Sequence, residues 1–271
     1  MLLERFLWTK ADEVARLRQQ ERKGALPVPF SGQRGDFIAA LQRREAGVPL
    51  TVIAEFKQAS PSRGPICRSL TVEEAARQYV AAGAGALSIL TERRFFAGEL
   101  DFLGRAAACC PGTPLLRKDF IFDPLQVRAT AATPAAALLL IVALTPDAAL
   151  LRRLREQAES LGMQAVVEVC GKKDLVLARE SGARIIQVNA RDLDTLRVDR
   201  RACLELARQC PPERGEIWIA ASGMDRREHL EEAARAGFSA ALVGTALMQE
   251  GQPGAALQRL LRGREEGHHA A

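Results

Sequence analysis

Short apolar runs recur along the chain from residue 51 onward, and each is followed by a polar loop and then by an alanine-rich amphipathic segment. Most of the runs do not alternate between apolar and polar positions, which is typical of strands buried on both faces of a parallel sheet. Eight strands are predicted, at Thr51–Lys57, Ala86–Leu90, Pro114–Lys118, Ala137–Ile141, Ala165–Val169, Arg184–Asn189, Glu216–Ala220 and Ala240–Val243.

Helical spacing characterises the segments between these strands, and a glycine often follows, which is typical of a helix C-terminus. The predicted helices include Val72–Ala82, Leu125–Ala132, Asp147–Leu161, Lys172–Ser181, Arg201–Gln209 and Arg226–Ala236. Alternating strands and helices predict the α/β class, as a (β/α)8 TIM barrel. A doubly wound open sheet is the alternative, but no Gly-x-Gly-x-x-Gly turn favours it.

The first 48 residues differ from this repeat and are predicted to form a helical extension. Leu3, Phe6, Leu7, Val14 and Leu17 fall at roughly helical spacing within residues 1–23. The stretch 24–35 contains two prolines and breaks this helix, and a second short helix is expected over residues 36–44. We expect a single domain over residues 1–271, with residues 1–48 covering the barrel mouth and Trp8 reaching toward it.

Composition narrows the classes of function. The chain has 271 residues and a net charge of +5, without a long basic block and with 5% aromatic residues, so no nucleic-acid partner is expected. The longest apolar run, Ala135 to Leu144, is too short to span a bilayer, and the N-terminus does not resemble a signal peptide. Its six cysteines form no Cys-x-x-Cys pair, so we expect no metal site and a cytoplasmic protein with reduced thiols.

Polar residues gather at the predicted strand ends, where the active site of a barrel forms. Only six of the 38 basic residues are lysines, and two of them, Lys57 and Lys118, end strands. Lysine can release its proton when its pKa is shifted, whereas arginine effectively cannot. Taken singly, these side chains could be structural ion pairs or caps; their convergence on one rim predicts a functional cluster. Its other members are Glu55, Glu168, Asn189, Arg191 and Ser222.

Two glycine-containing loops follow the last two strands, at Ser222-Gly223 and Gly244-Thr245. Phosphate sites in barrels often occupy these loops, because glycine lets backbone N–H groups approach the anion closely. The loops therefore predict a phosphate subsite and, with the modest positive charge, a small anionic substrate.

At this point the chain resembles the indole-3-glycerol-phosphate synthases of tryptophan biosynthesis, over about residues 3–260. The resemblance depends on the segments 53–64, 86–98, 115–124, 167–169, 188–193 and 242–248. It implies closure of the indole ring of 1-(2-carboxyphenylamino)-1-deoxyribulose 5-phosphate, with release of carbon dioxide and water and without metal or organic cofactor. It allows association with other enzymes of the pathway, and the short apolar runs predict no membrane partner.

The resemblance also implies roles for individual residues. Lys118 would be the general acid and Glu168 the general base, with Asn189 and Glu55 in the same polar network. Lys57, Ser60 and Arg191 would hold anionic groups of the substrate. Phe96 and Phe120 would contact its aromatic ring, and Ser222, Gly223, Gly244 and Thr245 would bind its phosphate.

The chain departs from the family pattern at several positions, and three of them bear most on these residues. Ala221 replaces a glutamate of the active-site network, Gln187 replaces a glycine, and Cys170 replaces a histidine. Losing an anion near Lys118 should lower the pKa of that lysine relative to relatives that keep the glutamate. Glu99 or another carboxylate could fill the gap.

Two other functions are considered. A phosphoribosylanthranilate isomerase would share the phosphate-binding barrel but would not explain the paired lysines, the Ser-Pro-Ser segment or the N-terminal extension. A catalytically weakened paralogue that binds the same ligand or a partner enzyme is motivated by Ala221, Cys170 and Gln187. Turnover of the carboxyphenylamino substrate separates it from a working synthase.

Overall fold

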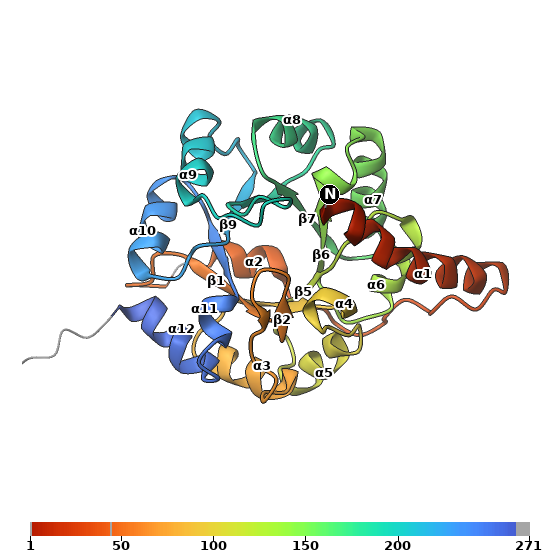
Figure 1. Cartoon of the computed structure of the whole chain (residues 1–271), viewed down its shortest axis with the longest axis horizontal. Coiled ribbons are helices and arrows are strands. Elements are labelled where there is room, and N and C mark those ends of the chain that lie inside the picture. Colours follow the sequence, from red (N-terminus) through yellow and green to blue (C-terminus); the bar gives the residue numbers. More distant parts are fainter. Residues whose placement is uncertain (1, 44, 264–271) are drawn as a thin grey trace, which may run out of the picture.

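Eight parallel strands form a closed barrel in the computed structural model, which describes residues 2–43 and 45–263 (Figure 1). Strands that are neighbours along the chain are neighbours in the barrel, and the last pairs with the first. The predicted (β/α)8 barrel is therefore confirmed, and each predicted strand matches an observed one to within one residue at either end. The strands are β1 (Thr51–Phe56), β4 (Ala86–Leu90), β5 (Leu115–Lys118), β6 (Ala137–Ile141), β7 (Gln164–Val169), β8 (Ile185–Asn189), β9 (Ile217–Ala221) and β10 (Ala240–Val243).

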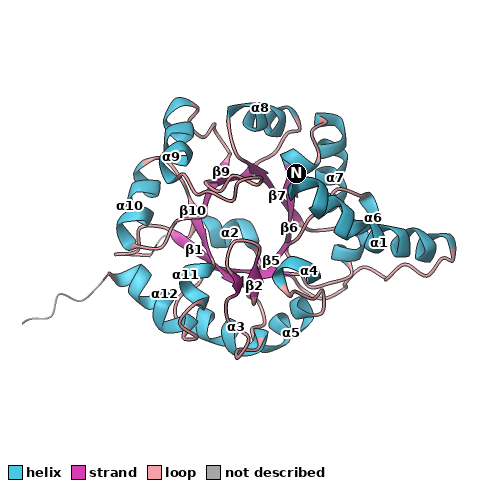
Figure 2. Ribbon diagram, in the orientation of Figure 1, coloured by secondary structure: helices cyan, strands magenta, loops and turns pink. Residues whose placement is uncertain are grey.

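An outer ring of helices surrounds the strands (Figure 2). It contains α3 (Val72–Ala81), α5 (Phe102–Cys109), α6 (Pro124–Ala131), α7 (Ala148–Ser160), α8 (Lys172–Glu180), α9 (Arg200–Gln209), α10 (Arg227–Arg235) and α12 (Pro253–Arg262). The sequence prediction did not include α5 or α12. Helix α5 carries one charged residue in eight, so no polar face marks it.

Shorter elements follow several strands at the carboxyl end of the barrel. They are the hairpin β2 (Ala59–Ser60) and β3 (Gly64–Pro65), the helices α4 (Arg93–Phe96) and α11 (Thr245–Met248), and the 3-10 helix η1 (Val142–Leu144). These elements were also not predicted, because two to four residues are too few to show a periodic pattern.

Side-chain caps explain where many of the helices begin. Thr71 accepts a hydrogen bond from the backbone of Glu74, whose carboxylate bonds back to the Thr71 backbone N–H, which together form a capping box. Asp123, Asp147 and Asp199 cap α6, α7 and α9 in a similar way. These acceptors satisfy backbone N–H groups that have no partner inside the helix.

The core has two layers. Side chains such as Ile53, Leu116 and Ile219 point inward and fill the barrel, while Trp218 and many others point outward and pack against the helices. The period-two alternation of the strands separates these two sets. Because both faces are covered, the strands contain few polar residues except near their carboxyl ends.

The N-terminal extension divides between the two ends of the barrel. Helix α2 (Phe37–Gln42) lies within the ring of strands in Figure 2, and its Phe37 and Leu41 pack against inward residues near the strand starts. Helix α1 (Leu2–Arg22) instead places Phe6 on Phe120, just after β5. Within the predicted extension, α1 therefore lies at the mouth, whereas α2 closes the opposite end.

No helix in the described part of the chain is long and apolar enough to cross a membrane.

Candidate active site

A cavity of about 1450 Å³ opens at the carboxyl end of the barrel. Every site residue predicted from the sequence lines it: Glu55, Lys57, Ser60, Phe96, Lys118, Phe120, Glu168, Asn189, Arg191, Ser222, Gly223, Gly244 and Thr245. Four of them lie on the barrel strands β1, β5, β7 and β8, and the others lie in the segments that follow strands. The closed parallel barrel explains this convergence, because all its strands end on the same rim.

Lys118 and Glu168 face each other across the cavity floor. Lys118 ends β5 and Glu168 is the fifth residue of β7, and Lys118 Nζ lies 3.5 Å from Glu168 Oε2. The lysine side chain is 18% exposed and the glutamate side chain 1%. The Lys118 ammonium group is therefore accessible from the cavity, and the buried Glu168 carboxylate lies beside it. A reaction that needs both an acid and a base requires such a pair.

Side chains of β8 hold the Glu168 carboxylate. Asn189 Nδ2 donates to Glu168 Oε1 at 3.0 Å, and Gln187 Nε2 donates to Glu168 Oε2. Asn189 is fixed in turn, because its Oδ1 accepts hydrogen bonds from Ser222 Oγ at 2.8 Å and from the Arg191 backbone N–H at 3.0 Å. The base candidate is thus oriented by a connected network.

A second ion pair lies at the end of β1. Lys57 Nζ contacts Glu55 Oε1 at 2.7 Å, and Ser88 Oγ donates to Glu55 Oε2 at 3.4 Å. Gly244 on the neighbouring strand end leaves room for this pair, since a Cβ atom there would come within 2.9 Å of Lys57 Nζ and closer still to Glu55. A larger residue at this point would therefore displace the ion pair.

Charges around the cavity favour the ionised forms of Lys118 and Glu55. Burial lowers the pKa of Lys118, but the Glu168 and Glu55 carboxylates raise it more, so the pKa lies above the ordinary lysine value. Burial raises the pKa of Glu55, and Lys57 and Lys118 lower it below the ordinary value overall. Ala221 stands where the resemblance implies a glutamate, yet two other carboxylates, Glu168 and Glu55, still act on Lys118.

Glu99 does not supply the carboxylate that Ala221 lacks. Its side chain is exposed and does not line the cavity.

The rim near β8, β9 and β10 offers donors for anions. Ser222 and Gly223 both have positive φ, of 70° and 75°, so the chain turns sharply there. Arg191 is half-buried, its Nη1 donates to the Leu196 carbonyl at 2.8 Å, and burial lowers its pKa. On the opposite side Ser60 lies in the β2–β3 hairpin, 3.4 Å from Ser62 Oγ.

Aromatic rings form the apolar wall. Phe6 of α1 stacks on Phe120 with ring centroids 4.1 Å apart, and Phe96 lies 6.2 Å from Phe120. Phe6 was not predicted as a site residue, because its spacing in an amphipathic helix marks it equally as core. Trp8 is 68% exposed, contacts Arg94 and does not line the cavity, so the expectation that it reaches the mouth is wrong.

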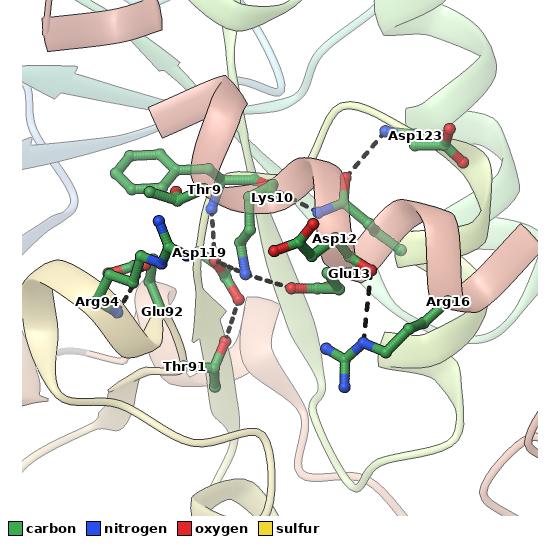
Figure 3. Close-up of polar contacts among 12 residues, drawn as sticks. Thr9, Lys10, Asp12, Glu13, Arg16, Thr91, Glu92, Arg94, Asp119 and Asp123 are labelled. Atoms are coloured by element: carbon green, nitrogen blue, oxygen red, sulfur yellow. Dashed lines mark hydrogen bonds and ion pairs between the residues drawn. The ribbon is translucent and has the colours of Figure 1, made fainter. Parts of the chain in front are cut away.

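A cluster of largely buried ion pairs holds α1 next to these aromatic rings. Lys10 Nζ on α1 lies 2.7 Å from Asp119 Oδ1 and 2.5 Å from Glu13 Oε2 of the same helix. Figure 3 shows these contacts. Arg117 on β5 pairs with the same two carboxylates, and Thr91 donates to Asp119. Because Asp119 directly follows Lys118, the docking of α1 is coupled to the strand that carries the acid candidate.

Sequence reasoning did not include Gln187 or Ser88 among the polar side chains that contact the site carboxylates. Gln187 was noted only as a departure from the family pattern, although it occupies the same face of its strand as Asn189. Inward alternation along β8 could have identified it. Ser88 lies inside an apolar run, and no sequence pattern indicates that it contacts a site carboxylate.

Among the described residues, no group of three or more histidine, cysteine, aspartate and glutamate side chains is arranged to hold a metal ion.

Comparison with known proteins gives a consistent result. Residues 3–260 match the family described as indole-3-glycerol phosphate synthase. An indole-3-glycerol phosphate synthase of Chloroherpeton thalassium is 41% identical over 254 residues, covering 91% of this chain and 94% of that protein. The corresponding protein of Koribacter versatilis is 40% identical over 247 residues, covering 91% of each.

Solved structures share the architecture at much lower identity. A 3-hexulose-6-phosphate synthase superimposes with a TM-score of 0.63 at 16% identity, covering 78% of this chain and 98% of that one. A second such synthase, from Salmonella typhimurium, gives a TM-score of 0.58 at 15% identity, covering 79% of this chain and 97% of that one. These similarities support the fold alone.

Proposed function

Because the chain belongs to the indole-3-glycerol phosphate synthase family, we propose that its cavity closes the indole ring with Lys118 as acid and Glu168 as base. The function is that of an indole-3-glycerol phosphate synthase, a carboxy-lyase of tryptophan biosynthesis that acts on a phosphorylated small molecule. Family membership also decides against the related isomerase. The assignment of Lys118 as acid and Glu168 as base depends on one observation, the 3.5 Å distance between Lys118 Nζ and Glu168 Oε2 in this cavity.

Lys118 acts first. As the aryl carbon of 1-(2-carboxyphenylamino)-1-deoxyribulose 5-phosphate attacks the carbonyl carbon, a carbon–carbon bond forms and the carbonyl electrons move to oxygen. Lys118 Nζ gives that oxygen a proton, which prevents a buried alkoxide from building up. The raised pKa of Lys118 supports this role, since the lysine stays protonated at neutral pH.

Glu168 acts after carbon dioxide has left. The C–O bond breaks and the hydroxyl group leaves as water with a proton taken from solvent, while Glu168 accepts the proton that the new ring loses from nitrogen or carbon, and the aromatic ring of the indole forms. The hydrogen bonds from Asn189 and Gln187 support this role, because a base must be held within reach of the proton that it removes.

The substrate carries two anionic groups, and the cavity offers two sets of donors. Ser222, Gly223, Gly244 and Thr245 would take the phosphate, and Lys57, Ser60 and Arg191 would take the carboxylate. Phe96 and Phe120 would pack against the aryl ring. No metal or organic cofactor is part of this proposal.

We further propose a cytoplasmic location and a single domain made of the barrel and its extension. Association with other enzymes of the tryptophan pathway is an expectation of family membership, which co-purification from the source cells would test. No nucleic-acid or membrane partner is proposed.

The test is the growth of indole fluorescence when the carboxyphenylamino substrate is added to purified protein. The Lys118→Ala variant should lose about 10²–10⁴-fold in rate. Lys173→Ala, which removes an exposed lysine on α8 outside the cavity, is the matched control and should keep the native rate.

A folded native protein that binds the substrate without turning it over would overturn the proposal. The protein would then be the weakened paralogue, and Ala221 would be the first position to restore.

A further inference from the structure

Gln187 is a fully buried amide beneath the site. It lies on β8 next to Glu168 on β7, and the register pairs these two residues directly. Its Nε2 donates to Glu168 Oε2, while its Oε1 has no hydrogen-bond partner. Among the described residues, the other buried side-chain atom without a hydrogen-bond partner is His229 Nδ1, which lies 2.9 Å from Asp225 Oδ1.

The orientation of this amide is set by the carboxylate. If the group were flipped, Gln187 Oε1 would face Glu168 Oε2 and two acceptors would repel each other. The donor end therefore faces Glu168, and the carbonyl end is left buried without a hydrogen-bond partner. An unsatisfied buried carbonyl is destabilising, so an apolar side chain would fill this space without that penalty.

Gln187 and Asn189 act on the carboxylate as a pair. They are two residues apart on β8 and so share its inward face, and each donates to a different oxygen of Glu168. Two donors on two oxygens fix the plane of the carboxylate, which a single hydrogen bond would not do.

Gln187 shares with Lys118 the same oxygen of Glu168, Oε2. Lys118 Nζ lies 3.5 Å from Glu168 Oε2, longer than a charge-assisted hydrogen bond of about 2.8 Å. With the amide bound to the same oxygen, part of its accepting capacity is occupied. Without the amide, Oε2 would draw Lys118 toward itself and away from the substrate's carbonyl oxygen.

We propose that Gln187 is a positioning residue that holds Glu168 from beneath and keeps Lys118 free to meet the substrate. This inference rests on the proposed roles of Lys118 and Glu168. It assigns a catalytic consequence to a side chain that lies in the wall of the cavity and does not touch the substrate.

The test compares two variants of the full chain in the indole fluorescence assay. Gln187→Met removes the donor and the orphaned acceptor at similar length, and Gln187→Leu removes both with a shorter, branched side chain. Both should lose about tenfold to hundredfold in kcat, because small displacements of reacting groups have effects of this size. KM should change less than about threefold, since no group that binds the substrate is altered.

Ile219→Met is the matched control, because Ile219 is the partner of Gln187 in the β8–β9 register, faces the same interior and does not line the cavity. It should keep the native kcat. Thermal unfolding of each variant is measured alongside, and both Gln187 variants should melt within about 5 °C of the native protein.

Two results would overturn the proposal. If Gln187→Met keeps the native kcat, the amide does not position the site. If kcat falls only together with a drop in Tm of more than about 5 °C, Gln187 is a packing residue. Absence of turnover in the native protein would instead refute the proposed function, so the two failures are distinguishable.

Discussion

Two opposing effects determine the pKa of Lys118. Burial lowers its pKa, and the carboxylates of Glu168 and Glu55 raise it further than burial lowers it. Ala221, at the end of β9, lines the same cavity without contributing charge. Two carboxylates thus favour the protonated form of Lys118. A substitution at Ala221 could place a third carboxylate in the same cavity.

Ala221→Glu should extend activity to higher pH. A new carboxylate near Lys118 raises its pKa further, so the acid stays protonated to higher pH and the alkaline limb of kcat/KM moves upward. The measurement is the pH profile of kcat/KM from pH 6 to 10, beside Ala221→Gln, which adds the bulk without the charge. An alkaline limb of kcat/KM at the same pH as in the native protein, or a loss of activity at every pH, would contradict this account.

Gly244→Ala should weaken catalysis without unfolding the protein. The new Cβ would collide with the ends of the Glu55 and Lys57 side chains, which can move, so the fold should survive while the ion pair shifts. We expect kcat/KM to fall about tenfold to hundredfold with little change in Tm. Gly104→Ala on α5, where a Cβ meets only ordinary contacts, is the control, and equal effects of the two substitutions would refute the prediction.

At the scale of elements, α1 depends on charge as well as on apolar packing. Lys10, Glu13, Arg117 and Asp119 form a buried cluster across α1 and β5. Burial alone would raise the pKa of Asp119, but Arg117 and Lys10 lower it to about 2. The helix is therefore held by a carboxylate that must stay ionised.

This cluster predicts a loss of stability in acid. The folded pKa of Asp119 is below its unfolded value, so its contribution is present above about pH 4 and is lost as the pH falls toward 2. The difference corresponds to about 2 kcal/mol. Urea unfolding from pH 7 to pH 2.5 should show this slope in the native protein.

The variants Asp119→Asn and Asp12→Asn complete that experiment. Asp119→Asn should be less stable than the native protein by about 3 kcal/mol at neutral pH, because it leaves buried cations unpaired, and the gap should narrow in acid. Asp12 is exposed on α1, so its substitution should leave both the stability and its pH dependence nearly unchanged. A constant gap at every pH would count against the role of Asp119.

At the scale of the whole molecule, the N-terminal extension contacts both ends of the barrel. Helix α1 contributes Phe6 to the cavity wall, and α2 contributes Phe37 and Leu41 to the interior packing at the opposite end. The chain's two tryptophans lie on different parts of this assembly, Trp8 on α1 and Trp218 in the outer core layer of the barrel.

The tryptophans can therefore show whether extension and barrel unfold together. Trp8→Phe leaves a barrel reporter, and Trp218→Phe leaves a reporter on α1. In each variant, the fluorescence transition should coincide with the loss of helical circular dichroism, because shared contacts make one cooperative unit. If Trp8 fluorescence changes at lower denaturant than the circular dichroism of the same variant, the extension is a separate unit.

Much of the molecule is determined locally by its sequence. A strand buried on both faces must be apolar, so the eight barrel strands could be predicted as short apolar runs, and the helices between them as amphipathic segments with aspartate or threonine caps. Because parallel strands all end on one rim, the polar residues at their ends could be assigned to one cavity, which each of them lines.

Only the tertiary structure determined which side chains meet. The contact between Lys10 and Asp119 joins segments more than 100 residues apart, and no local pattern indicates that α1 closes on β5 while α2 enters the other end of the barrel. The same holds for Gln187, whose spacing gives its face of the strand but not its partner. The bond to Glu168 and the unpaired carbonyl depend on how β7 and β8 align, and this alignment exists only once the barrel has closed.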